Sequence, residues 1–136
     1  MIQQLQLILP EMPRGFHLIT DKVETFVHPL PEKGLLNLFL QHTSAGLCIN
    51  ENADPSVRTD LEYYFDWLVK ENNPHFTHIY EGTDDMPAHI KSVLTGNSLS
   101  IPIHNNRLAL GTWQGIYLCE FRNKGGRRKI WITVIS

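Results

Sequence analysis

Two stretches of the chain carry side chains that a hydrophobic core does not need. The first, residues 81–91, places Asp84 and Asp85 at the expected start of a helix and His89 four residues after Asp85. Residues four apart on a helix are neighbours, so a carboxylate and an imidazole should share one surface. That pair suits a divalent metal, and the amides of a helix start suit an anion such as phosphate. The alternative is helix capping by an aspartate, with His89 exposed to solvent.

The second stretch, residues 111–115, interrupts a strand pattern with two glycines around Trp113 and Gln114. Glycine within a strand usually marks a bulge or a close approach of the backbone. Trp113 can stack on a planar heterocycle while the amide of Gln114 reads the edge of that ring. The alternative places Trp113 in the core or at a subunit interface and makes Gln114 a sheet-edge amide.

A third set of polar residues surrounds a short apolar run, residues 46–49. His42 precedes the run, and Glu51 and Asp54 follow it within residues 50–54. The connection is short enough to predict that both groups meet at one edge. With His89 they offer oxygen and imidazole ligands that suit zinc, magnesium or manganese, although no tight zinc spacing such as HExxH is present. The alternative is that each is a solvated or hydrogen-bonded group.

Other chemical signals are weaker. Lys91 and Arg107 are candidate phosphate partners, whereas the basic residues 127–129 suit a solvated strand entrance. Ser44 follows His42 by two residues, so their side chains share one face of a strand, but no GxSxG elbow accompanies them. Nucleophilic hydrolysis is therefore a minor alternative.

The elements that must position these residues follow from periodicity and turn residues. The runs between prolines and acidic turns predict strands, and the nearly all-apolar run 35–40 favours a strand covered on both faces. Asp54 and Pro55 predict a helix start, and a stripe of apolar residues supports that helix as far as residues 72–74. A second helix should run from about residue 85 to Gly96. We therefore predict an α+β domain, a largely antiparallel β-sheet sandwich with two helices, whose strands cover residues 2–9, 15–20, 22–27, 35–42, 98–104, 107–111, 112–122 and 127–135.

Length and composition narrow the class of protein. The 136 residues suit one domain, residues 1–136. A net charge of −2 and scattered basic residues argue against nucleic acid, and the absence of a basic leader or a long apolar run predicts neither a signal peptide nor a membrane span. Only Cys48 and Cys119 occur, without a CxxC pair, so we expect buried free thiols in a reducing compartment, the cytoplasm.

Four segments, residues 41–45, 50–55, 82–91 and 111–115, together resemble the YjbQ-type family of secondary thiamine-phosphate synthases, and the resemblance covers nearly the whole chain. It implies a compact α+β subunit that forms a homotrimer, with pockets lined by these segments and shared between neighbours. It also implies a weak activity that joins hydroxymethylpyrimidine diphosphate to a thiazole phosphate and releases pyrophosphate. The partners would then be further copies of the chain and a small phosphorylated heterocyclic substrate.

The candidate residues can be fitted to that chemistry as a hypothesis. A metal and cationic donors at the second helix would neutralise the leaving pyrophosphate. The alternatives are a non-catalytic homotrimer that binds a metabolite or a metal, and a scaffold in which Asp84, Glu51 and His89 share no cavity. The hypothesis assigns catalysis to His89, Asp84 and Glu51, substrate binding to Asn50, Lys91, Trp113 and Gln114, and a divalent metal to His42, Asp54 and His89.

Overall fold

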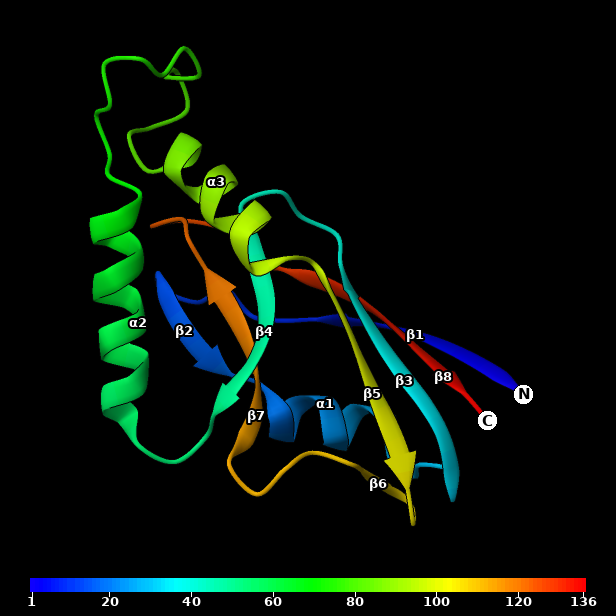
Figure 1. The fold of residues 1–136 in the computed structure, drawn as a ribbon. Helices are drawn as coiled ribbons and strands as arrows, with labels where there is room; N and C mark the ends of the chain where they lie inside the picture. The colour runs from blue at the N-terminus through cyan, green and yellow to red at the C-terminus, as the bar shows by residue number, and fades with distance from the viewer.

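In the computed structural model, which describes residues 1–136, two antiparallel sheets pack face to face and three helices complete the fold (Figure 1). The five-stranded sheet has the order β1-β8-β3-β5-β6, and the three-stranded sheet has the order β2-β7-β4. All strand pairs are antiparallel, as predicted. The strands are β1 (Ile2–Ile8), β2 (Gly15–Leu18), β3 (Lys33–Leu40), β4 (Ala45–Glu51), β5 (Ser98–His104), β6 (Arg107–Leu108), β7 (Gln114–Glu120) and β8 (Lys129–Ile135).

The main core fills the space between the two sheets. Alternate residues of β3 and β8 point into it, and their partners in the three-stranded sheet include Leu47 and Leu118. The opposite face of β3 is not covered within this chain, because Leu35 and Phe39 are 37% and 45% exposed. The prediction that this strand is covered on both faces is therefore wrong for the single chain. Its residues follow the one-sided alternation of an antiparallel sheet instead.

The uncovered face of the five-stranded sheet is unusually apolar. The register places Ile2, Ile135 and Leu35 side by side across β1, β8 and β3, and it places Trp131 beside Phe39. All five side chains are at least 37% exposed. An apolar patch of this kind is typical of an interaction site.

Helices α2 (Pro55–Leu68) and α3 (Asp85–Thr95) cover the outer face of the three-stranded sheet (Figure 1). The carboxylate of Asp54 accepts a hydrogen bond from Ser56 N at 2.9 Å, so the predicted cap and the predicted start of α2 are confirmed. The predicted end of α3 is also confirmed, since Gly96 follows its last turn with a φ of 88°. None of the helices is both long and apolar enough to span a membrane.

Helix α1 (Thr20–Val27) lies where the sequence predicts a strand, residues 22–27, so that prediction is wrong. Val23 and Val27 satisfy a strand pattern through Thr25, but they are also one helical turn apart. Both valines are buried against the core, whereas Thr25 is exposed. The segment is helical because a helix places Val23 and Val27 on one buried face and leaves the polar residues between them in solvent.

Candidate metal centre

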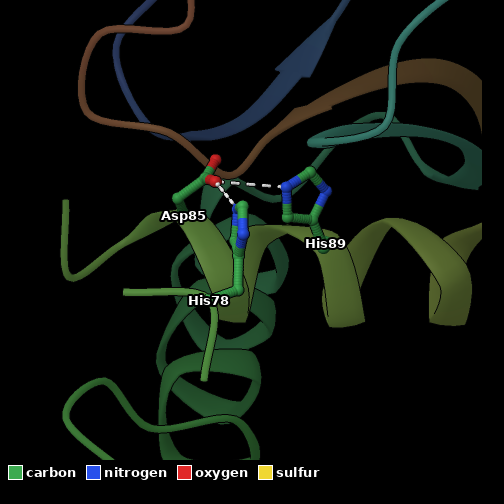
Figure 2. Close-up of side chains that lie close together, drawn as sticks. All are labelled: His78, Asp85 and His89. Carbon is green, nitrogen blue, oxygen red and sulfur yellow. Dashed lines mark hydrogen bonds and ion pairs between the residues drawn. The ribbon is translucent and has the colours of Figure 1, made fainter. Parts of the chain in front are cut away.

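Three side chains converge at the start of α3, and we call them the imidazole cluster: His78, Asp85 and His89 (Figure 2). Asp85 and His89 are one turn apart on α3, whereas His78 comes from the loop that precedes the helix. The Oδ2 atom of Asp85 lies 2.6 Å from His78 Nε2 and 3.2 Å from His89 Nε2. The ligand atoms of all three residues lie within 4.8 Å of one another.

The orientation of His89 is fixed by the backbone. Its Nδ1 atom lies 2.8 Å from the carbonyl oxygen of Thr43. A carbonyl oxygen can only accept, so Nδ1 carries the proton and Nε2 of the neutral ring is bare. That bare nitrogen faces the carboxylate oxygen of Asp85, which is also an acceptor. A cation between the two atoms, either a proton or a metal ion, removes this conflict.

Asp85 is held from its other side. Its Oδ1 atom accepts a hydrogen bond from Arg122 Nη1 at 2.6 Å, and its side chain is only 2% exposed. Burial opposes the ionisation of Asp85, but the hydrogen bond from His78 and the charge of Arg122 outweigh it and keep the pKa of this carboxyl below its usual value. The carboxylate therefore stays ionised at neutral pH, as a metal ligand must.

Asp84 has a different partner set from Asp85. Its Oδ2 atom accepts hydrogen bonds from Arg122 Nε at 3.0 Å and from the backbone N–H of Asn123 at 2.9 Å. Burial opposes ionisation here too, but these donors lower the pKa of Asp84 overall. The side chain makes no capping hydrogen bond to α3, so the capping alternative for Asp84 is not borne out. Asp84 therefore holds the guanidinium of Arg122 in position, and Arg122 in turn hydrogen-bonds to Asp85.

The residues of the imidazole cluster fit a divalent metal. Zinc lies about 2.0–2.2 Å from nitrogen and oxygen ligands, so three ligands need to be only a few ångströms apart, as they are in the cluster. Ligating histidines usually donate their second N–H to a carbonyl or a carboxylate, and His89 does so to Thr43. Two imidazoles with one carboxylate favour zinc or a similar transition metal over magnesium.

A cavity of about 350 Å³ lies beside the cluster, and both His42 and His89 line it. The Nε2 atom of His42 accepts a hydrogen bond from Lys129 N at 2.8 Å, which occupies that nitrogen. Burial first, and then the charge of Arg128, lowers the pKa of His42 and keeps the ring neutral. His42 thus shares a cavity with His89, as predicted. Because Nε2 accepts from Lys129 N, the proton of the neutral ring is on Nδ1, which can donate a hydrogen bond but cannot bind a metal, so the predicted metal-ligand role of His42 is not supported.

The predicted meeting of His42 with residues 50–54 is wrong within one protomer. His42 lies before β4 and Glu51 ends that strand, so the two groups are separated by its length, about 20 Å. Figure 1 shows that α3 lies at one end of β4 and the start of α2 at the other. Asp54 caps α2 at this far end and does not join His42 and His89.

Residues 50–54 instead meet the Gly111–Gly115 segment. Asn52 N donates to Trp113 O at 2.9 Å, and Glu51 pairs with Gln114 in the sheet register. Asn50 is exposed beside them, and its side chain accepts a hydrogen bond from Glu51 N at 2.8 Å. Two of the four predicted segments therefore gather at each end of β4. Within one protomer Asp84 and His89 share no cavity with Glu51, which is what the scaffold alternative expects.

The surroundings of Gly115 explain why this position of the Gly111–Gly115 segment is a glycine. A side chain on Gly115 would approach Leu18 to 2.6 Å and Asn52 to 2.9 Å, so the predicted close approach of the backbone is confirmed. Trp113 is 65% exposed, which excludes the alternative that places it in the core.

Lys91 does not line the candidate site. Its side chain is 1% exposed, and Nζ lies 2.6 Å from Asp66 Oδ1 on α2 and above the ring of Phe121. The predicted contact between Lys91 and a substrate phosphate is therefore unsupported, because the ammonium points under α2. The sequence could not show this, since Asp66 is 25 residues away.

His78 is the site residue that the sequence prediction missed. It lies in an irregular loop between α2 and α3, where no periodicity marks it. The only local signal is an acidic residue three positions later, Glu81. Its Oε2 atom lies 3.6 Å from His78 Nε2.

A family model described as "UPF0047 protein YjbQ-like" matches residues 5–136. The chain belongs to the YjbQ-like family. It is 53% identical over 133 residues to the UPF0047 protein YjbQ of Salmonella typhimurium, with 96% of each chain covered. A UPF0047 protein of Synechocystis is 45% identical over 129 residues, which cover 94% of this chain and 88% of the relative. The resemblance read from the four sequence segments is thereby confirmed at the level of the family.

Solved structures of YjbQ-like relatives share the fold. A conserved hypothetical protein from Thermus thermophilus is 38% identical with a TM-score of 0.84, covering 94% of this chain and 97% of that one. A YjbQ/UPF0047 family protein from Clostridium acetobutylicum is 37% identical with a TM-score of 0.85, covering 96% and 99%. The predicted α+β fold with antiparallel sheets is confirmed, with three helices in place of the two predicted.

Proposed function

We propose that this YjbQ-like chain is a metal-dependent thiamine-phosphate synthase of low activity. The substrates would be hydroxymethylpyrimidine diphosphate and a thiazole phosphate. A bond forms between the thiazole nitrogen and the methylene carbon of the pyrimidine, while the bond from that carbon to the diphosphate oxygen breaks. The electron pair leaves with pyrophosphate. The observation that carries the proposal is the imidazole cluster beside a cavity of about 350 Å³.

The chain's own residues would bind and orient the reacting groups. His78, Asp85 and His89 would hold a zinc ion. When bound, this ion would act as a Lewis acid and neutralise the negative charge on the departing pyrophosphate. Thr43 and Asn97 line the cavity, and their side chains can donate hydrogen bonds to phosphate oxygens. The hydrogen bond from His89 Nδ1 to Thr43 O holds the imidazole ring in the orientation that directs Nε2 at Asp85.

The predicted ring-binding residues would come from a neighbouring subunit. Trp113 and Gln114, together with the predicted catalytic residue Glu51, lie at the far end of β4 from the imidazole cluster, so one protomer cannot bring them to the cluster. The proposal therefore includes a homotrimer, and the apolar outer face around Trp131 and Phe39 supports it. It also includes a cytoplasmic location, which the free thiols of Cys48 and Cys119 support.

Thiamine-phosphate formation tests the proposal directly. Protein purified without a polyhistidine tag would be assayed before chelation, after chelation and after zinc is restored. We expect turnover to disappear with the metal and to return with zinc, and we expect His89→Ala to abolish turnover while the protein stays folded by circular dichroism. Turnover that survives both treatments would remove the cluster from the reaction.

A non-catalytic homotrimer that binds a metal or a metabolite is the second candidate, and one observation favours it. No lysine or arginine lines the cavity beside the cluster, because Lys91 is paired with Asp66 and Arg122 is paired with Asp84 and Asp85. A diphosphate normally meets such cations. Zinc binding without measurable turnover on the two substrates would support this candidate, since an enzyme must bind the transition state better than its substrates.

A further inference from the structure

The two cysteines of the chain lie against each other, although they are 71 positions apart in the sequence. Cys48 is in β4 and Cys119 is in the neighbouring strand β7. Gly46 is the direct partner of Cys119 in the sheet register, so Cys48 reaches Cys119 on the diagonal between the strands. Their Sγ atoms are 3.5 Å apart, and we call these two thiols the dithiol pair. A disulfide bond is about 2.0 Å long, so a shift of about 1.5 Å would join the two sulfurs.

The dithiol pair lies in the apolar layer between the three-stranded sheet and the helices that cover it. Cys119 is fully buried there, in a cluster that includes Phe16, Phe121 and Ala88 of α3. Cys48 packs against the same cluster but is only half-buried, and its strand is the edge strand of the sheet. A small reagent that arrives from solvent therefore meets Cys48 first, and Cys119 is shielded.

The contact also makes the two thiols chemically unequal. The hydrogen bond with the thiol of Cys119 lowers the pKa of Cys48, although burial acts in the opposite direction. The same hydrogen bond, together with burial, raises the pKa of Cys119. The thiolate is the nucleophilic form of cysteine, so both accessibility and ionisation make Cys48 the more reactive residue.

We propose that the dithiol pair is a redox site that reduces hydroperoxides and closes to a disulfide within one chain. The thiolate of Cys48 attacks one oxygen of the peroxide and the O–O bond breaks. Cys48 becomes a sulfenic acid, and the other oxygen takes up a proton and leaves in water or an alcohol. The thiol of Cys119 then attacks the sulfur of Cys48, the S–O bond breaks, and water leaves. The two sulfurs lose two electrons in all, and the peroxide gains them.

The position of Cys119 gives the second step a clear purpose. A sulfenic acid without a neighbouring thiol is oxidised further to sulfinic and sulfonic acids, which do not return readily to the thiol. At Cys48 such a charged group would lie beside Tyr117, its partner in the register, in a layer that is otherwise apolar. The disulfide keeps this layer uncharged and joins two strands that are already paired. A small thiol restores the reduced pair by thiol–disulfide exchange.

Oxidation of the intact, reduced protein with equimolar hydrogen peroxide tests the proposal. Titration with a chromophoric thiol reagent should show the loss of both thiols, and peptide mass spectrometry should find Cys48 joined to Cys119 in one chain. Treatment with dithiothreitol should restore both thiols. Two thiols that persist in peroxide, or a disulfide that joins separate chains, would overturn the proposal.

Two matched variants, Cys119→Ala and Cys48→Ala, test the order of the steps. Without Cys119, peroxide should convert Cys48 to a sulfinic acid, because no thiol captures the sulfenic acid. Without Cys48, the buried thiol of Cys119 should react at least about tenfold more slowly than Cys48 does in the other variant. Equal rates in the two variants would overturn the assignment of Cys48 as the attacking residue. The disulfide test on the unmodified sequence stands even if a variant fails to fold.

The dithiol pair needs neither the imidazole cluster nor the proposed synthase reaction. Asp85→Asn, which removes a proposed metal ligand, should therefore form the same disulfide in equimolar peroxide. A chain that closes this disulfide but binds no zinc would refute the metal centre alone. A chain that binds zinc but keeps both thiols in peroxide would refute the redox site alone.

Discussion

The roles of the adjacent residues Asp85 and Asp84 can be separated by the two matched changes Asp85→Asn and Asp84→Asn. Both carboxylates are bonded to Arg122, but only Asp85 faces the imidazoles. An amide at Asp85 has one acceptor atom in place of two, so either the contact with Arg122 or the contact with His78 is lost. A hydrogen bond to a charged group contributes about 1.5–3 kcal/mol, and we expect the free energy of unfolding of Asp85→Asn to fall by about 2 kcal/mol.

The effect on metal binding should differ more sharply than the effect on stability. Loss of an outer partner of a metal ligand typically weakens binding about 10–100-fold, so removal of the anionic ligand Asp85 should weaken zinc binding by more than about 100-fold. Asp84→Asn should cost no more than about tenfold, because its oxygen can still accept from Arg122 Nε and Asn123 N.

Zinc titration in competition with a chromophoric chelator measures both affinities, and urea unfolding measures both stabilities. Affinity retained within about tenfold in Asp85→Asn would refute the assignment of this carboxylate as a ligand. Equal losses in the two variants would also refute it, because they would indicate a general disturbance of the loop around Arg122 and not the removal of a ligand.

Three further predictions follow from the same contacts. Lys91→Met should lower the free energy of unfolding by only about 1 kcal/mol, because Arg14 still pairs with Asp66, and it should leave zinc affinity unchanged; a large loss of zinc affinity would contradict the placement of Lys91. Acid should destabilise the fold, because the pKa of Asp85 in the folded state lies below its unfolded value of about 3.9. The contribution of this carboxylate to the free energy of unfolding is complete above the unfolded pKa and is lost as the pH falls through the folded pKa. Urea unfolding at pH 7 and pH 3 checks this prediction. Trp131→Glu should convert the proposed homotrimer into monomers in sedimentation, and an unchanged mass would show that the apolar outer face is not the interface.

Local signals predicted the elements well wherever one period was unambiguous. Asp54 and Pro55 mark the start of α2, and Gly96 marks the end of α3, because caps and glycines act on the nearest backbone. Residues 22–27 were mispredicted as a strand because Val23 and Val27 fit both periods. Only burial against the core, which depends on distant strands, decides between the two.

The candidate site was predicted in part. Asp85 and His89 were expected to be neighbours, since they are one helical turn apart, and they are. His78 reaches them through an irregular loop, so no spacing rule could identify it. The grouping of His42 with Glu51 failed for a different reason: a short connection in sequence is long in space when its residues are extended.

The cavity beside the imidazole cluster and a cavity of about 840 Å³ lined by Asn52 and Gln114 lie at opposite ends of β4, which has a consequence for cooperativity. A strand paired along its whole length with β7 is stiff, so it offers no bistable element that one ligand could switch on behalf of the other. A ligand at one end and a ligand at the other should therefore bind without influencing each other in an isolated subunit. A measured heterotropic effect between them would therefore have to arise between subunits of the proposed homotrimer.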